Sequence, residues 1–228
     1  AYVRPANRHL YLLQPRNYND MMEEDRNKET VQIFNKHADR YAEKYFDLRD
    51  YDDFDVRLIT SVGHRGSFIN VACGPGNVSF YVREHRPDID VIGVDLAPNM
   101  LKEARARVPG AMFELCDCTK LESLGRTFDA AAFAFGLSYL NDGAAEQCLA
   151  SLHLVLNSGS TLMLSTIASR EPTQQHETTS SGEQILIFYR TPEQVKSIIE
   201  AHGFQVTFMK CIASPSNAPK ITEDVVFI

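Results

Sequence analysis

The 228-residue sequence has no apolar run that approaches the roughly 20 residues that a membrane-spanning helix needs. Its first residues, "AYVRPANRHLYLLQP", also lack the continuous apolar core of a secretory signal peptide. We therefore expect no membrane partner and a cytoplasmic location.

Cationic side chains are also in short supply. The chain has 23 Lys and Arg against 30 Asp and Glu, which gives a formal net charge of −7. A nucleic-acid surface normally needs clustered Lys and Arg to displace counterions, so we expect no nucleic-acid partner. A neutral or cationic small molecule is the easier substrate for such a chain. With 44% hydrophobic residues, the chain can build one large domain or a domain with a small appendage.

The cysteines form no C-x-x-C pair. They are Cys73, Cys116, Cys118, Cys148 and Cys211. Their odd number argues against a disulfide framework, and the missing ligand pair argues against a zinc site. We therefore expect no bound metal and a reducing compartment.

The pattern of apolar residues changes at about residue 28. Residues 1–27 show no sustained period, and we expect an irregular N-terminal extension. Beyond it, Ile33, His37, Tyr41 and Tyr45 recur every four residues, which predicts one amphipathic helix with an aromatic face. A second helical segment follows, so residues 28–62 are expected to form a helical lid or cap.

From residue 66 onward, short β-branched segments alternate with helical ones. Strands are expected at 68–72, 90–95, 111–116, 128–135 and 161–167. Several of these strands are apolar on both faces, which predicts a parallel sheet covered by helices on both sides. The domain is therefore expected to span residues 28–228, with its core at 66–228.

The C-terminal part departs from this alternation. The polar segment "ASREPTQQHETTSSGEQ" is expected to be a long loop, and "ILIFYR" a short strand after it. Thr191, Pro192 and Gln194 fit a capping box that opens a helix. Residues 204–211 and 223–228 are expected to pair as antiparallel strands at the end of the sheet.

The stretch "NVACGPGNVSF", residues 70–80, places a glycine turn between the first strand and a helix. A dinucleotide fingerprint would need a third glycine where Ser79 stands, and a phosphate-binding loop would need a Gly-Lys-Ser/Thr ending. Taken alone, Gly74 and Gly76 are at least as compatible with a purely structural turn as with a binding site.

Two aspartates favour a nucleoside ligand over an empty turn. Asp95 ends the second strand, 19 residues after Gly76, where a carboxylate can accept both hydroxyls of a ribose. Asp117 follows the third strand, from which a carboxylate can accept an adenine amino proton. The carboxyl ends of parallel strands meet at one edge of the sheet, where ligands of open α/β folds bind.

At this point the sequence resembles the class I S-adenosylmethionine-dependent methyltransferases. The resemblance covers about residues 30–228 and rests on the segments "FINVACGPGNVSFYV", "VIGVDLAPNML", "FELCDCTKL", "FDAAAFAFGLSYL" and "LHLVLNSGSTLMLST". Within the family, "FNKHADRYAEKYF" and "TTSSGEQILIFYRTPEQV" are most similar to the branch that methylates small molecules. The resemblance implies a Rossmann-like seven-stranded, mostly parallel sheet with a C-terminal antiparallel strand pair. It also implies S-adenosylmethionine as cofactor and S-adenosylhomocysteine (SAH) as product.

The resemblance also implies which residues hold the cofactor. Ala72, Cys73, Gly74 and Gly76 would approach its amino-acid end, although the family has glycine where Ala72 stands, so a slightly wider turn is expected. Asp95 would hold the ribose. The remaining implied contacts are Leu96, Met100, Asp117 and Cys118 with the adenine, Phe135 near the methyl group, and Tyr41 at the carboxylate.

The predicted reaction is in-line transfer of the methyl group to an O, N, S or C nucleophile. A general base is needed only if the nucleophile is protonated, and the candidates are Tyr139, His37 and His176. Two other functions remain open: an NAD(P)-dependent oxidoreductase, and a protein that binds the cofactor without methylating. The sequence "FGLSYL" takes the place of the Asn/Asp-Pro-Pro-Tyr signature of enzymes that methylate exocyclic amines or glutamine side chains.

Overall fold

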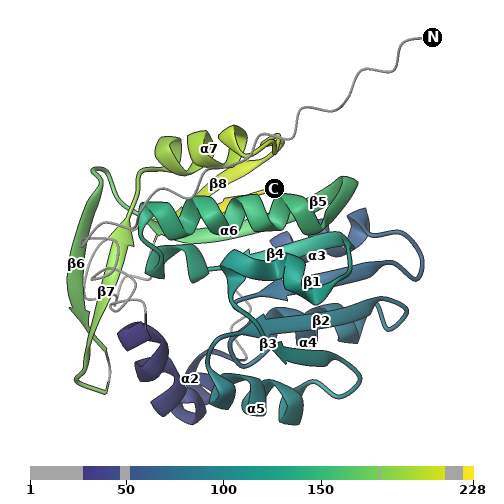
Figure 1. Cartoon of the computed structure of the whole chain (residues 1–228), viewed down its shortest axis with the longest axis horizontal. Coiled ribbons are helices and arrows are strands. Elements are labelled where there is room, and N and C mark those ends of the chain that lie inside the picture. The colour runs from purple at the N-terminus through teal and green to yellow at the C-terminus, as the bar shows by residue number, and fades with distance from the viewer. Residues whose placement is uncertain (1–27, 47–51, 180, 214–222) are drawn as a thin grey trace.

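A seven-stranded sheet, in the order β3-β2-β1-β4-β5-β9-β8, forms the centre of the computed structural model (Figure 1), which describes residues 28–46, 52–179, 181–213 and 223–228. The strands are β1 Ser67–Val71, β2 Asp90–Asp95, β3 Met112–Leu115, β4 Phe128–Ala134, β5 Leu156–Ala168, β8 Met209–Ala213 and β9 Glu223–Phe227. Strands β1 to β5 are parallel, and β9 runs antiparallel between β5 and β8. The expected Rossmann-like sheet is confirmed, whereas the extension over residues 1–27 lies outside the described residues.

Helices cover both faces of this sheet. They are α3 Asp52–Ser61, α4 Asn77–His85, α5 Pro98–Arg107, α6 Asp142–Val155 and α7 Pro192–Ala201, with 3-10 turns η1 Cys118–Leu124 and η2 Gly136–Tyr139. On one face, Leu58 of α3 and Val82 of α4 are buried against Phe68 of β1. On the other face, α6 and α7 pack against the alternate residues of the strands. None of the helices described in the structure is both long and apolar enough to cross a membrane.

The expected N-terminal helix is broken. Residues 28–36 are helical, His37 leaves helical geometry with φ −114° and ψ 24°, and α2 continues from Ala38 to Tyr45. The prediction of one continuous helix is therefore wrong at His37. The His37 ring bonds to Glu183, which lies far along the chain. The spacing of apolar residues along a helix gives no information about a contact with a residue so distant in sequence.

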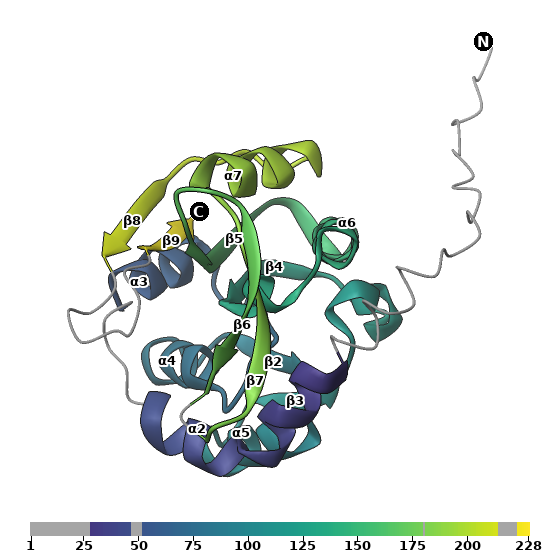
Figure 2. The same ribbon diagram turned by 90° about the vertical axis from the view of Figure 1, so that its left-hand side faces the viewer.

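The polar segment that was expected to be a loop is a strand. β6 Thr173–Thr178 pairs antiparallel with β7 Gln184–Tyr189 in a separate two-stranded sheet. Figure 2 shows this hairpin crossing in front of the main sheet, from the level of α7 toward α2. The loop prediction failed because β6 is polar throughout, whereas the alternating apolar residues that fix the hairpin lie on its partner, β7.

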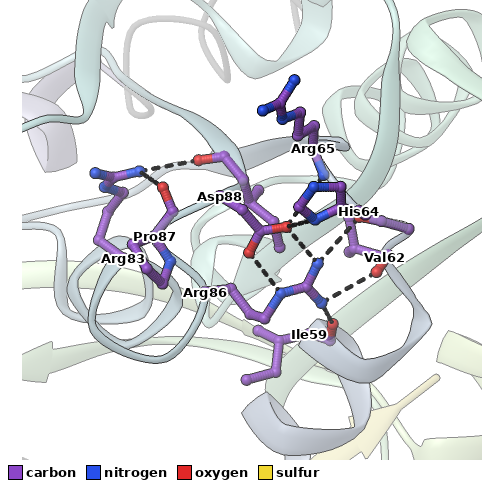
Figure 3. Close-up of polar contacts among 10 residues, drawn as sticks. Ile59, Val62, His64, Arg65, Arg83, Arg86, Pro87 and Asp88 are labelled. Atoms are coloured by element: carbon purple, nitrogen blue, oxygen red, sulfur yellow. Dashed lines mark hydrogen bonds and ion pairs between the residues drawn. The ribbon is translucent and has the colours of Figure 1, made fainter.

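At the edge of the sheet where β1 begins, Arg86 fixes the connection from α3 (Figure 3). Its Nη1 donates to the carbonyls of Ile59 and Val62 at 2.8 and 3.1 Å, and its Nη2 donates to the Gly63 carbonyl at 3.0 Å. These bonds satisfy carbonyls that the end of a helix leaves without partners. Arg86 also pairs with Asp88 and holds the pKa of that carboxyl well below its usual range.

Gly136, the first residue of η2, allows the chain to turn closely at the end of β4. A Cβ there would lie 2.2 Å from the ring of buried Phe133 and 3.0 Å from the Ala72 Cβ. We expect Gly136→Ala to lower the free energy of unfolding by about 1–3 kcal/mol, the usual cost of overpacking. Chemical denaturation measures this difference.

Gly143→Ala is the matched control, because a Cβ at Gly143 would meet nothing closer than an Asn141 side-chain oxygen at 3.7 Å. It should change stability by less than about 1 kcal/mol. Equal stabilities of the two variants would contradict the steric argument.

Candidate active site

The turn after β1 contains three left-handed residues. Ala72, Gly74 and Gly76 have φ angles of 50°, 52° and 90°. Gly74 has open space around it, because an added Cβ would meet no atom within 4 Å, whereas a Cβ on Gly76 would lie 3.1 Å from Val108, the residue after α5. Ala72 adopts the same region as a non-glycine residue, at a cost of about 1–2 kcal/mol. Position 72 therefore has the left-handed backbone that favours glycine, although alanine occupies it.

Asp95, at the end of β2, links this turn to the next one. Its carboxylate accepts the Gly74 amide and the Ala97 amide, each at 2.8 Å. Burial raises the pKa of Asp95, and the surrounding backbone amides oppose that rise by stabilising the charged form. The result is a half-buried carboxylate at the carboxyl edge of the sheet, beside the open space at Gly74.

The other implied cofactor contacts lie along the same edge, with one exception. Leu96 is exposed beside Asp95, and Asp117 accepts the amide and hydroxyl of Thr119 at 2.9 and 2.8 Å. Cys118 is half-buried at the start of η1. Met100 differs, because it is buried against Ala38 of α2 and so contacts the N-terminal helices.

Two further implied contacts differ in burial. Cys73 is buried, and burial raises the pKa of its thiol, so it is an inert packing residue in this structure. Phe135 is half-buried at the end of β4 with a left-handed φ of 60°, and its amide donates to the Ser165 carbonyl at 2.9 Å.

Ser79 occupies the place of a third glycine. Its hydroxyl is fully buried and accepts the Asn70 side-chain amide of β1 at 3.0 Å. A dinucleotide fold uses glycine there so that helix and strand can approach closely. In this chain a hydrogen-bonded side-chain pair fills that space between β1 and α4.

The N-terminal helices bring aromatic rings to this edge. Phe34 lies edge-on to Tyr41 and to Tyr139, with ring centroids 5.6 and 4.9 Å apart. The ring centroids of Tyr41 and Tyr45 lie 4.7 Å apart. After burial and Tyr45, the charge of Asp95 also contributes to raising the pKa of Tyr41. Burial, the largest cause, raises the pKa of Tyr41 and of Tyr139 well above the usual range. Both phenols are therefore neutral hydrogen-bond donors near neutral pH.

The structure does not bring the three candidate bases together. Tyr139 packs against Phe34, His37 bonds to Glu183, and His176 is exposed on the hairpin. His176 stands opposite Leu186, whereas the face that packs on Phe34 and Tyr139 carries the neighbouring residues of β7. Among the described residues, no group of three or more His, Cys, Asp and Glu side chains could hold a metal.

Two contacts that fasten the N-terminal helices were not predicted from the sequence. Asn35 accepts the Asn99 amide with its side chain and the Asn99 side chain with its carbonyl, both at 2.8 Å, which ties residues 28–36 to the start of α5. Glu183, at the turn of the hairpin, accepts Lys36 Nζ at 2.6 Å and also bonds to His37. Capping and turn motifs involve residues that are neighbours in sequence. These two contacts join residues far apart in the chain, so no such motif could predict them.

Arg190 supports the turn that carries Tyr139. The buried guanidinium donates to the carbonyls of Leu137 and Leu140 at 3.2 and 2.7 Å and pairs with Asp142 at 2.8 Å. Because these partners flank η2, Arg190 fixes the backbone on both sides of Tyr139. A charge bound in this way is not available to an anionic ligand.

Comparison with known proteins identifies the central part of the chain. Residues 68–159 match the family model described as "Methyltransferase domain". A trans-aconitate 2-methyltransferase from Methylobacterium nodulans is 32% identical over 34% of this chain and 30% of its own length. A malonyl-[acyl-carrier protein] O-methyltransferase from Pseudescherichia vulneris is 29% identical over 53% of this chain and 47% of its own length. The chain thus spans less than half the length of these curated relatives.

Solved structures share the fold over a larger part of the chain. The DhpI–SAH complex has a TM-score of 0.62 at 17% identity and covers 89% of this chain and 97% of its own. The glycopeptide N-methyltransferase MtfA, complexed with S-adenosylmethionine, has a TM-score of 0.60 at 17% identity and covers 78% of this chain and 92% of its own. At this identity the likeness concerns the fold.

The ion pairs of Glu183 predict a pH dependence for the N-terminal helices. The bond from Lys36, followed by that from His37, lowers the pKa of Glu183 below its ordinary value of 4.5. A carboxyl with a lowered pKa stabilises the folded contact above its ordinary pKa, and the contribution is lost as pH falls through the lowered value. We therefore expect Glu183→Gln to speed hydrogen exchange in residues 28–45 by about a few-fold at pH 7, and the difference to vanish at pH below the lowered pKa.

Glu200→Gln is the matched control, because it removes an exposed ion pair with Lys196 (3.8 Å) in α7. It should leave exchange in residues 28–45 unchanged. Identical exchange in wild type and Glu183→Gln at pH 7 would show that the pairs do not hold these helices.

Proposed function

Since the methyltransferase domain at residues 68–159 and the fold place this chain in the class I S-adenosylmethionine-dependent methyltransferase family, we propose that it is an enzyme that methylates a small molecule. The reaction is an in-line displacement at the methyl carbon. The observation that carries the proposal is the Asp95 carboxylate, half-buried at the end of β2 and bonded to the turn that contains Gly74. The cofactor supplies a methyl group already activated on a sulfonium.

The residues along this edge fit the cofactor. A carboxylate can accept about four hydrogen bonds, so Asp95 has acceptor capacity beyond the Gly74 and Ala97 amides for the ribose hydroxyls. The space beside Gly74 leaves its backbone accessible to the amino-acid end of the ligand. Leu96 and the Asp117–Cys118 peptide are assigned to the adenine, and Phe135 to the region of the methyl group.

The acceptor is assigned to the side of the site formed by Tyr139, the N-terminal helices and the hairpin. Ligands of open α/β folds bind over the carboxyl edge, and the cofactor takes the half above β1 to β3. Rings and apolar side chains in this region exclude water, which favours transfer to a positioned nucleophile. Tyr139 is neutral because its pKa is raised, so it serves as a donor that orients the acceptor.

Residues 28–45 are assigned the role of a lid. Phe34 and Tyr41 reach from these helices to the rings and the carboxylate at the sheet edge. A lid must exclude water during transfer and open for exchange of product. Contacts made largely through exposed side chains such as Lys36 are weak enough to permit such opening.

The acidic net charge supports a small-molecule partner over a nucleic acid. The five cysteines are all free, which agrees with the reducing cytoplasm as location. A protein that binds the cofactor without methylating would retain SAH binding but would release no SAH from S-adenosylmethionine with any acceptor.

Asp95→Asn tests the cofactor assignment. The Gly74 and Ala97 amides bond to different oxygens of Asp95, so the variant keeps an acceptor for one of them and removes the charge. We expect SAH affinity to fall by about 1.5–3 kcal/mol, or roughly 10- to 150-fold. Titration calorimetry measures the change. Asp90→Asn, at the other end of the same strand and paired with Arg126 at 2.6 Å, should bind SAH as the wild type does. Unchanged affinity in a folded Asp95→Asn protein would refute the assignment.

Hydrogen exchange with and without SAH tests the lid. We expect exchange in residues 28–45 to slow when SAH is added, because closure over the ligand protects their amides. The amides of α7, on the far side of the hairpin, should exchange at the same rate in both conditions. Equal protection of residues 28–45 with and without ligand would make them a permanent part of the covering layer.

A further inference from the structure

Two cysteines from different elements meet beneath the part of the edge that is assigned to the adenine. Cys118 opens η1 directly after Asp117 and is half-buried, whereas Cys148 lies within α6 and is fully buried. Cys148 belongs to the main apolar core, and Cys118 packs against that core. Methyl transfer itself requires neither thiol.

The packing of η1 on α6 brings these two side chains together. Ser151 of α6 accepts the Leu121 amide of η1 and donates to Glu122 Oε2, both at 2.7 Å. Cys148 stands three residues before Ser151, so both side chains point from the same side of α6 toward η1. Cys118 packs on this side, and its side chain hydrogen-bonds with the Cys148 thiol. The two sulfur atoms are therefore neighbours in the folded chain.

The two thiols differ in how readily an oxidant reaches them. Burial, the largest cause, raises the pKa of Cys148 well above its ordinary value, and the hydrogen bond with Cys118 adds to the rise. The thiolate is the form that reacts with oxidants, so Cys148 is a poor first target. Cys118 has accessible surface and is therefore the thiol that reacts first.

Two other cysteines are less suited to pair with Cys118. Cys116 is close to Cys118, but its thiol donates to the carbonyls of Asp117 and Lys120 at 3.5 and 3.8 Å. Cys211 is exposed on β8, at the opposite end of the sheet from β3, the strand that leads into η1. Cys148 is thus the partner that the packing offers.

We propose that Cys118 and Cys148 are a redox pair, which a hydroperoxide converts to a disulfide that weakens binding of the cofactor. The effect on the cofactor rests on the proposed function, because Asp117 and Cys118 are assigned to the adenine. Thiols of a reducing compartment return such a disulfide to the two free cysteines, so the reduced pair is the resting state.

The oxidation takes place in two balanced steps. The Cys118 sulfur attacks one oxygen of the hydroperoxide, the oxygen–oxygen bond breaks, and the thiol proton leaves on the departing oxygen. The Cys148 sulfur then attacks the sulfur of the resulting sulfenic acid, and the hydroxyl leaves with the Cys148 proton as water. The two thiols lose two electrons, which the peroxide gains. The second step is the slower one, because burial disfavours the Cys148 thiolate.

A disulfide at this place displaces η1 rather than α6. A covalent bond holds two sulfur atoms closer together than a hydrogen bond does, so one element must move. Helix α6 has 14 residues and buries one side in the main core. In contrast, η1 is a short 3-10 turn that Lys120 interrupts with non-helical φ −140° and ψ 36°. The Asp117–Cys118 peptide therefore moves with η1, away from the position assigned to the adenine.

Peptide mass spectrometry and calorimetry on the full chain test both parts of the inference. After hydrogen peroxide is added to the reduced protein, we expect the peptides that contain Cys118 and Cys148 to be joined. Dimedone present during the reaction should label Cys118 before the joined peptides accumulate. The oxidised protein should bind SAH about three- to tenfold more weakly, which corresponds to the loss of one hydrogen bond, and dithiothreitol should restore the affinity.

Four variants identify the thiols that react. Cys148→Ala should form no joined peptides and should remain labelled by dimedone at Cys118. Cys118→Ser should have the same SAH affinity before and after peroxide. Cys116→Ser and Cys211→Ser are the matched controls, and both should respond to peroxide as the wild type does.

The outcomes separate this inference from the function on which it rests. Joined peptides together with a reversible fall in SAH affinity support the redox pair. No joined peptides in the wild type, a disulfide that involves Cys116 instead, or unchanged SAH affinity once the disulfide has formed would overturn it. Failure of the reduced wild type to bind SAH would overturn the proposed function, and the mass-spectrometric result would still decide whether the disulfide forms.

Discussion

The carboxylate of Asp95 joins the two turns on which the site depends. Strands β1 and β2 end side by side, and each is followed by a tight turn whose backbone amides point toward the sheet edge. Asp95 accepts one amide from each turn, Gly74 and Ala97, both at 2.8 Å. A partly buried carboxylate is stable only when such donors surround it. The geometry of the edge is therefore fixed by one charge and by the amides that stabilise it.

The half of the site above this edge is assembled from segments far apart in the sequence. Residues 28–36 are tied to α5 through Asn35 and Asn99 and to the hairpin through Lys36 and Glu183. Apolar contacts between the helices, η2 and β7 fill the space between these two fastenings. Within this apolar cluster the rings of Phe34 and Tyr139 pack edge to face, with centroids 4.9 Å apart.

The sheet was predictable because its strands are short apolar runs bounded by turn residues, and both the Asp90–Asp95 strand and the capping box at Thr191 appear in the structure as expected. The sequence placed the residues proposed for the cofactor at this edge for the same reason, since Gly74 and Asp117 each follow such a strand and Asp95 ends one. The hairpin and the break in the N-terminal helix at His37 could not be predicted in this way. Their positions depend on Glu183 and on β7, and polar contacts between distant segments do not produce a period in the sequence.

Burial along this edge determines which ionisable groups keep their protons near neutral pH. It raises the pKa of Tyr41 and Tyr139, so these phenols keep their protons, and it raises the pKa of Asp95 against the opposing effect of the backbone amides. Phenols that stay protonated can donate hydrogen bonds and present ring faces, but they cannot take a proton from a substrate near neutral pH. If the acceptor carries a proton that must be removed, a carboxylate is the stronger choice of base than a tyrosine at this edge.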